Sequence, residues 1–331
     1  MKEDSIKQFK KARAFVLKEQ CRIELPLPSN IGKKAGKLVT IFLGEENTLF
    51  NLIEIYSTEI PEYIANPVKG TKELKINYCA TGRCELQLKS GECTYLTAGE
   101  IAIDTGQAEN SFYYPSGEYI GYEVIVSIES DEMGCHKDAL PVPLFLYTYF
   151  EGQTRPWIRA AGKFLSGFYD SFKYYTEEKI GNELISLKCM ELLIYLTKLD
   201  FEQGAVRRTY YTASQTKIAK RVKELICSDL SIRYAARDLA ERFGVSETSL
   251  KNYFRSVYGC GYAEFQQNAR MEKAAELLKG TEQKIADIGL AVGFITQAKF
   301  GAAFKTYFGV TPLEYRRQHR LGEKSYMPNK K

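Results

Sequence analysis

The stretch DLAERFGVSETSLKNYFR, from Asp238 to Arg255, decides the fold of the C-terminal third of this chain. Gly244 permits the left-handed backbone that a tight turn between two helices needs, and Ser246 is a good N-cap for the second helix. Apolar residues recur at helical spacing around that turn and are expected to face inward: Leu239, Ala240, Leu250, Phe254 and Val257. The pattern predicts a helix-turn-helix unit, whose second helix enters the major groove of DNA.

The polar side chains of this second helix are left for its outer face, near the end that enters a groove. Hydrogen-bonding groups in that place read base edges or hold phosphates. We therefore expect the helix to contact DNA through Ser246, Thr248, Ser249, Lys251, Asn252 and Arg255.

A second stretch, IADIGLAVGFITQAKFGAAFK from Ile285 to Lys305, repeats the plan. Gly293 makes the turn and Thr296 caps, while Phe300 and Phe304 form the inward stripe. The expected DNA contacts of this unit are Thr296, Gln297, Lys299 and Lys305. Between the units, residues from about Tyr262 to Leu278 predict a helix roughly 25 Å long. A rod of that length can hold two recognition helices about one DNA turn apart, roughly 34 Å.

Charge is distributed unevenly along the chain of 331 residues. From Ser214 to Lys331 there are 21 Lys and Arg and 12 Asp and Glu, so the net charge is 21 − 12 = +9. The rest of the chain holds 25 basic and 29 acidic residues, a net charge of −4. A basic third attached to a mildly acidic body favours contact of that third with a polyanion.

Other residue counts exclude several classes of protein. The chain has two histidines, His136 and His319, far apart in sequence, so imidazole-rich metal sites and most histidine-based catalysis lack their residues. The eight cysteines are scattered and are expected to be reduced thiols. Cys79 and Cys84 flank a predicted turn at residues 80–83 and could face each other across a hairpin, which leaves a redox role open. No apolar run suits a membrane helix and the charged N-terminus does not suit a signal peptide, which favours a cytoplasmic protein.

The front of the chain predicts strands and then helices. We assign no element to residues 1–45. From about Thr48 to Ile128, short runs rich in branched and aromatic residues alternate with Gly, Pro and Asn turn signals, which predicts a sandwich or a small barrel such as a jelly roll. From Trp157 to about Leu199 apolar residues recur at helical spacing. Residues 200–215 interrupt that pattern and are expected to connect two domains.

Residues 216–317 resemble the AraC-type (arabinose-regulator) transcription factors. Landmarks of that family occur in order: Leu239-Ala240, Gly244-Val245-Ser246, Leu250, Phe254, Gly259, Arg270, Ala275, Leu277-Leu278, Ile285, Ile288, Gly293-Phe294, Phe300, Phe304-Lys305, Gly309, Pro312 and Tyr315-Arg316. The segments SLKNYFRSVYG and QAKFGAAFK are most similar to the pyochelin-type siderophore regulators.

The resemblance implies an α+β chain in four parts. Residues 1–150 are expected to be a cupin-like, effector-binding β-barrel or jelly roll with its core at 48–128. Residues 151–199 are a helical segment that dimerises or covers the barrel, through Leu184, Leu187, Leu192 and Leu196. Residues 200–215 are the linker, and 216–320 form the all-α double helix-turn-helix domain.

A regulator of this kind is expected to bind double-stranded operator DNA and a small-molecule effector as a homodimer. It is expected to activate transcription, with RNA polymerase as a further partner, and to need no cofactor or metal. Two alternatives stay open. One is a DNA-repair or cupin-type enzyme that uses the same DNA-binding module, and the other is an architectural DNA-binding protein that responds to no ligand.

Aromatic residues are dense in the β region and suggest where an effector binds. A cavity lined by them with one arginine would suit a planar, acidic molecule, and barrel mouths commonly hold ligands. The alternative is that these side chains only fill the core of the sandwich. The candidate residues are Tyr78, Arg83, Tyr95, Phe112, Tyr113, Tyr114 and Tyr122, with Tyr119 beside them.

The second recognition helix departs from the family pattern. The resemblance places Ala298, Gly301 and Ala302 at outward positions that often carry polar or basic side chains, and these residues lack hydrogen-bonding groups for base edges. We therefore expect the first recognition helix to make most of the direct base contacts and the second mainly to hold phosphates.

Overall fold

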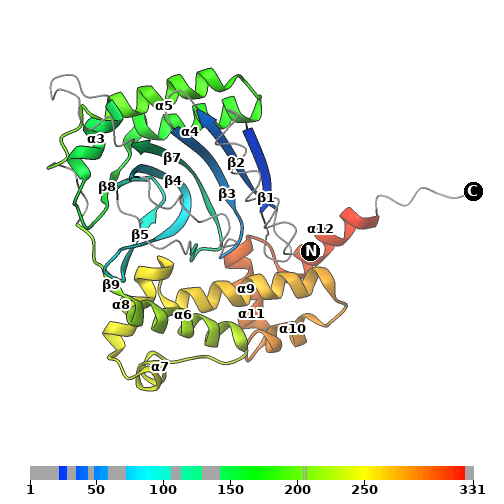
Figure 1. Cartoon of the computed structure of the whole chain (residues 1–331). Helices are drawn as coiled ribbons and strands as arrows, with labels where there is room; N and C mark the ends of the chain where they lie inside the picture. The colour runs from blue at the N-terminus through cyan, green and yellow to red at the C-terminus, as the bar shows by residue number, and fades with distance from the viewer. Residues whose placement is uncertain are drawn as a thin grey trace, which may run out of the picture. The chain divides into compact units, whose positions relative to one another are not determined.

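The computed structural model divides the chain into two compact units, Met1–Ala213 and Ser214–Lys331 (Figure 1). The structure describes residues 22–27, 35–43, 48–58, 72–105, 113–128, 142–203, 205 and 207–324. The first unit combines a β-sheet with helices, and the second is built from helices.

The first unit is built on an antiparallel sheet. Within the described residues its main path runs in the order β1 (Arg22–Leu27), β2 (Gly36–Leu43), β3 (Thr48–Ile55), β7 (Tyr119–Ile128), β4 (Lys72–Gln87), β5 (Glu92–Thr97) and β9 (Tyr211–Thr212). Off this path, β6 (Glu100–Asp104) pairs with β4 and with β8 (Trp157–Ala160). The β-rich prediction for residues 48–128 agrees with these strands, whereas β1 and β2 lie in the part to which no element was assigned.

The predicted hairpin at residues 80–83 is wrong, because β4 contains a bulge there instead of a turn. The strand continues through these residues, but its register against β7 shifts between Cys79 and Thr81, and Gly82 takes a φ of +87°. In a regular strand, side chains five positions apart point to opposite faces. Because the bulge reverses the alternation, Cys79 and Cys84 belong to the same buried cluster on one face of the sheet. Burial raises the pKa of Cys79 to about 12 and that of Cys84 well above its usual value, so both thiols stay protonated at neutral pH.

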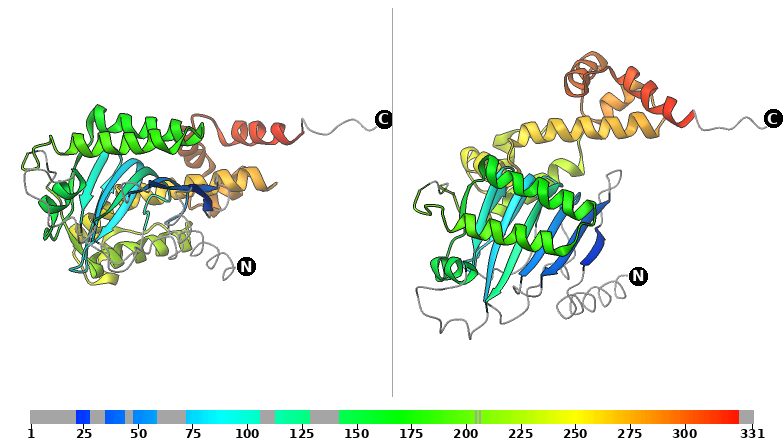
Figure 2. Two further views of the ribbon diagram at one scale, coloured as in Figure 1. Left: turned by 45° about the horizontal axis from the view of Figure 1, so that its top comes forward. Right: turned by 90° about the horizontal axis from the view of Figure 1, so that it is seen from above.

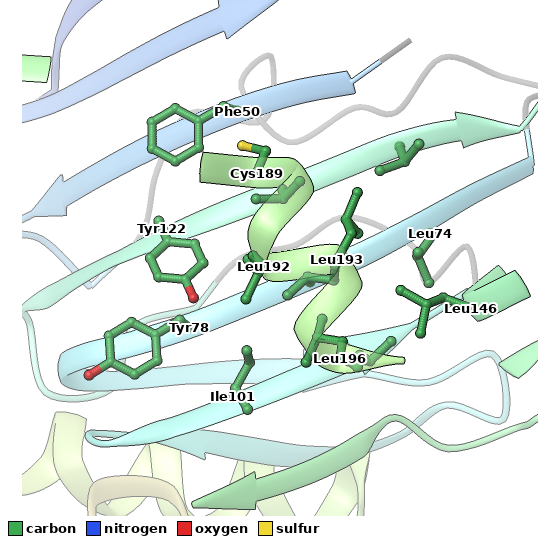
Figure 3. Close-up of a cluster of buried hydrophobic side chains, with 14 of the residues drawn as sticks. Phe50, Leu74, Tyr78, Ile101, Tyr122, Leu146, Cys189, Leu192, Leu193 and Leu196 are labelled. Atoms are coloured by element: carbon green, nitrogen blue, oxygen red, sulfur yellow. The ribbon is translucent and has the colours of Figure 1, made fainter. Parts of the chain in front are cut away.

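Three helices cover the other face of the sheet: α3 (Val142–Phe150), α4 (Gly162–Glu177) and α5 (Asn182–Leu196) (Figure 1). Figure 3 shows one α5 face lying over the sheet, where its side chains join Phe50, Tyr78 and Tyr122 in the main core. The residues that α5 buries are Ile185, Cys189, Leu192, Leu193 and Leu196.

The predicted helical segment from residue 157 is wrong over its first four residues, which form β8 and pair with β6. So short an apolar run carries no reliable period. The predicted linker differs too, because Tyr211–Thr212 form β9 and helix α6 (Ala213–Ser228) begins directly after them.

The second unit joins two helix-turn-helix pairs through one long helix. The first pair is α7 (Ala236–Phe243) with α8 (Glu247–Tyr258), and the second is α10 (Ile285–Ala291) with α11 (Gln297–Phe308). Between them, α9 (Tyr262–Gly280) has 19 residues, about 28 Å at 1.5 Å per residue (Figure 2). Helix α12 (Pro312–Lys324) packs against the second pair through Tyr315. None of the helices in the described residues has the length and apolar content needed to span a bilayer.

Candidate nucleic-acid interface

In the first helix-turn-helix pair, α7 and α8, the turn is formed by the residues predicted to form it. Gly244 has a φ of +65°, and the Ser246 hydroxyl accepts a hydrogen bond of 3.1 Å from the Ser249 backbone N–H. The Ser246 hydroxyl also donates to Ser249 Oγ at 2.9 Å. The predicted N-cap is confirmed, and both serine hydroxyls belong to the cap, so their role in DNA contact stays a prediction.

Helix α8 presents polar side chains to solvent. Its inward residues Leu250, Phe254 and Val257 are buried, as the spacing predicts. Lys251 Nζ lies 3.1 Å from Glu247 Oε2, an exposed pair of about 0.5 kcal/mol that leaves the lysine able to turn to another anion. The remaining outward side chains are exposed and form no hydrogen bond or ion pair with the described part of the chain: Thr248, Asn252 and Arg255.

The second helix-turn-helix pair, α10 and α11, has the same local construction. Gly293 has a φ of +83°, and Thr296 Oγ1 accepts from the Lys299 backbone N–H at 3.3 Å, which confirms the predicted cap. Phe300 and Phe304 are fully buried. The expected contact residues of this unit are exposed: Thr296, Gln297, Lys299 and Lys305.

The two recognition helices correspond residue by residue at an offset of 50, since 297 − 247 and 308 − 258 both equal 50. Each has 12 residues, a hydroxyl N-cap and a glycine in the left-handed region at its C-terminus. The outer faces differ in chemistry, because α11 holds Ala298 where α8 holds Thr248, and Ala302 where α8 holds Asn252. Only α8 therefore offers hydrogen-bonding groups along the middle of this face.

A buried group of hydrogen bonds made by Gln266 and Arg270 connects α9 to other parts of the C-terminal unit, Ser214–Lys331. Arg270 Nε donates to the Leu230 carbonyl at 2.8 Å and its Nη2 to the Ile232 carbonyl at 3.0 Å, while Gln266 Nε2 also donates to the Ile232 carbonyl at 2.6 Å. The turn at Gly293 packs against the same group, since a Cβ there would lie 2.7 Å from Arg270 Nη2. Arg270 thus holds the segment before α7 and the turn before α11 on one helix, a role that sequence spacing does not reveal.

Two basic residues of α7 escaped the sequence analysis. Arg237 and Arg242 are exposed on the first helix of the first pair, which in this motif crosses the DNA backbone. Their outward positions at the ends of an apolar stripe were the available signal. Helix α10 has no Lys or Arg, so only the first helix-turn-helix pair carries basic side chains on its first helix.

The candidate effector residues do not gather in one place. Tyr78 and Tyr122 stack with ring centroids 5.2 Å apart on the face covered by the helices, as Figure 3 shows. Tyr114 packs on Tyr119 at 5.0 Å in the cluster on the opposite face. Phe112 lies outside the described residues. Alternation along the strands therefore separates side chains that look like one set in sequence.

Arg83 and Tyr95 form a third group at the β4–β5 hairpin. The Arg83 guanidinium lies 5.3 Å from the centroid of the Tyr95 ring, and the Tyr95 hydroxyl donates to Glu85 Oε2 at 2.8 Å. Burial, with the nearby Arg208 charge, lowers the pKa of Arg83. The Tyr113 carbonyl joins the group by accepting from the Glu85 backbone N–H.

A polar ladder on the sheet face opposite α4 and α5 was also missed. Thr40 Oγ1 donates to Asn51 Oδ1 at 2.8 Å, and Asn51 Nδ2 donates to Glu123 Oε2 at 3.0 Å. Glu123 is paired in register with Asn77, whose Oδ1 accepts from the Tyr119 hydroxyl at 2.7 Å. The residues come from separate strands, so only strand pairing reveals their proximity.

The C-terminal unit is similar in sequence to known helix-turn-helix domains. A helix-turn-helix domain family matches residues 239–318. The transcriptional activator AggR of Escherichia coli is 23% identical over 242 residues, which cover 71% of this chain and 88% of that protein. The transcriptional activator AarP of Providencia stuartii is 30% identical over 106 residues, which cover 32% of this chain and 78% of that protein. A solved transcriptional regulator from Chromobacterium violaceum with an AraC-type DNA-binding domain covers 33% of this chain at 27% identity, with a TM-score of 0.30.

The fold and the two capped recognition helices define a DNA-binding transcription regulator. The chain belongs to the AraC family of transcription regulators. Members of this family are not enzymes, and this assignment removes the repair-enzyme and cupin-enzyme alternatives.

Proposed function

We propose that the protein is a ligand-responsive, sequence-specific activator of transcription. The observation that carries the DNA-binding part is the pair of matched recognition helices, each capped and each with an exposed outer face. The names of AggR and AarP favour activation. An activator of this kind would have RNA polymerase as a partner. Selection of the full-length chain on a library of random duplexes tests this function: we expect a defined motif to be enriched, whereas unenriched binding would leave an architectural role.

In this proposal the two recognition helices have different roles in DNA binding. Helix α8 reads base edges through Thr248, Lys251, Asn252 and Arg255, and α11 holds phosphates through Gln297, Lys299 and its N-terminal amides. The support is the loss of hydrogen-bonding groups along the middle of the α11 face.

We infer that the first unit is a cupin-like effector domain whose state reaches the DNA-binding unit through the linker. The linker is fastened to this unit beside the Arg83 and Tyr95 group. Arg208 forms an ion pair with Glu100, and the Arg155 guanidinium lies 4.1 Å from the centroid of the Tyr210 ring. Strand β9 pairs with β5, and α6 starts directly afterwards. An effector with different affinities for the fastened and the released linker would shift the balance between them.

The ion pair between Arg208 and Glu100 is expected to limit how often the linker is released. Glu100→Gln removes the charge of a pair in which both side chains are about 15% exposed, so we expect local opening to become about five- to thirtyfold more frequent. Tryptic cleavage after Arg207 and Arg208 should accelerate accordingly. The matched control is Glu92→Gln, whose exposed contact with Arg155 at 3.9 Å should change cleavage less than twofold. Equal effects of the two variants would contradict the fastening role.

The effector itself is expected to be small and polar or aromatic. The polar ladder of Thr40, Asn51 and Glu123 and the Arg83–Tyr95 group both offer hydrogen-bonding and charged groups that are buried or half-buried. The resemblance to pyochelin-type siderophore regulators makes a siderophore-like aromatic acid the first compound to test by calorimetry. Failure of every such compound to alter DNA affinity would favour the ligand-independent alternative.

We propose that α5 also joins two copies of the chain. Leu192 and Leu196, expected among the dimer residues, are buried against the sheet, so they cover it instead. The opposite side of α5 has an exposed stripe with alternating spacings of three and four: Leu184, Leu187, Glu191 and Ile194. Such spacing is typical of a helix that packs on a second helix.

Leu187→Glu tests this surface, because Leu187 is 66% exposed and its replacement costs the monomer little. We expect sedimentation to change from dimer to monomer and affinity for a two-half-site duplex to fall at least tenfold. Phe145→Glu on α3, at a side chain that is 45% exposed, is the control and should leave the dimer intact. A dimeric Leu187→Glu protein would exclude α5.

A further inference from the structure

The middle of the outer face of α11 consists of methyl groups. Ala298, Ala302 and Thr306 are exposed at intervals of four residues, so they form one row along the helix. The Thr306 hydroxyl donates to the Ala302 carbonyl at 3.0 Å, which turns it back toward the helix and leaves its methyl group outward. Ile295, just before the cap, is 84% exposed, the highest value among the large apolar side chains of the described residues. We call Ile295, Ala298, Ala302 and Thr306 the methyl row.

Positively charged side chains lie on both sides of this row, which favours contact with a nucleic acid. Lys299 and Lys305 are exposed on its two sides, at positions from which they can reach the phosphates of opposite groove walls. Gly301 lies beside the row, and a Cβ there would meet nothing within 4 Å. Small side chains allow the backbone of a helix to approach the floor of the major groove closely.

We propose that α11 recognises thymine through the C5 methyl groups in the major groove. Thymine is the base that presents a methyl group there, and alanine and threonine methyl groups are suitable partners. The inference rests on the proposed function, and it gives base selectivity to a helix otherwise expected mainly to hold phosphates. By the offset of 50, Ala302 occupies the place of Asn252, so the two helices read the same groove with different chemistry.

The test compares two random duplex libraries, one synthesised with thymine and one with uracil, which lacks only the methyl group. We expect the motif selected by the full-length chain from thymine duplexes to contain two or more thymines under α11. Replacing each of them singly by uracil should weaken binding about fourfold, from the transfer free energy of one buried methyl group. Thymines outside the α11 half should tolerate uracil within twofold.

Two matched variants assign the effect to the row. Ala302→Asn installs the amide found in α8, so preference at that position should move toward adenine and the uracil effect there should vanish. Asn252→Ala should leave the uracil effect under α11 unchanged. Circular dichroism of both variants checks that the fold is kept.

Failure of the inference can be told from failure of the proposed function. If no motif is enriched from thymine duplexes, sequence-specific DNA binding itself is contradicted. If a motif is enriched but uracil has no effect under α11, only the methyl recognition is overturned. Loss of activation in Ile295→Ser, with unchanged DNA affinity and no uracil effect, would mean that a protein covers the row instead.

Discussion

Gly293→Ala is expected to lower the free energy of unfolding of the C-terminal unit by about 3 kcal/mol or more. The backbone there has a φ of +83°, which strains any residue with a Cβ. The added Cβ would also lie 2.7 Å from Arg270 Nη2 and 2.7 Å from the Ser231 carbonyl oxygen. Relieving that overlap moves the guanidinium that holds the carbonyls of Leu230 and Ile232, so the strain and the lost hydrogen bonds add together.

A graded series of the same substitution provides the controls. Gly244 has a φ of +65° but open space around it, so Gly244→Ala should cost only the backbone strain, about 1–2 kcal/mol. Gly301 lies within α11 with open space, so Gly301→Ala should stabilise by up to about 1 kcal/mol. Urea unfolding followed by circular dichroism measures the series. The single tryptophan, Trp157, reports the N-terminal unit, and its fluorescence transition should not move. If Gly244→Ala and Gly293→Ala lowered the free energy of unfolding equally, the structural role of Arg270 would be contradicted.

Asn252→Ala is expected to reduce discrimination at one base pair of the selected motif about five- to 150-fold. An exposed amide at the middle of a recognition helix can make a bidentate contact with adenine, and such a contact contributes about 1–3 kcal/mol of discrimination. The variant should keep its stability, because Asn252 is exposed and forms no hydrogen bond with the described part of the chain.

Lys299→Ala is the matched comparison, since it removes a charge from the other recognition helix. It should weaken binding to all sequences alike and lower the slope of affinity against salt concentration by about one. Competition assays with the selected duplex and its single-base variants measure both effects. If Lys299→Ala relaxed base preference while Asn252→Ala left it intact, the proposed division between α8 and α11 would be wrong.

The helix-turn-helix units could be predicted closely because their signals are local. Ser246 and Thr296 cap the helices that they precede, and Gly244 and Gly293 adopt the left-handed backbone that the turns need. Caps and turns are determined by a few neighbouring residues, so a single sequence contains the necessary information. The bonding of Arg270 to Leu230 and Ile232 joins residues about 40 positions apart and left no such local pattern.

The β unit was predictable in kind but not in detail. Branched and aromatic runs indicated strands, yet the bulge after Cys79 reversed the facing of every later residue of β4. A single-residue change of that type brings Cys79 and Cys84 to one face of the sheet, and no residue type marks it. Pairing between distant strands also decides that Trp157 begins a strand, although helical spacing follows it.

The two helix-turn-helix units of one chain are expected to act together on one duplex. Hydroxyl-radical footprinting of the full-length chain on its selected duplex measures this joint binding. We expect, within each half-site, two protected stretches on one face of the DNA with centres about 10 base pairs apart. Asn252→Ala should weaken protection of the first and Lys299→Ala of the second. A single protected stretch per half-site, or two on opposite faces of the duplex, would contradict it.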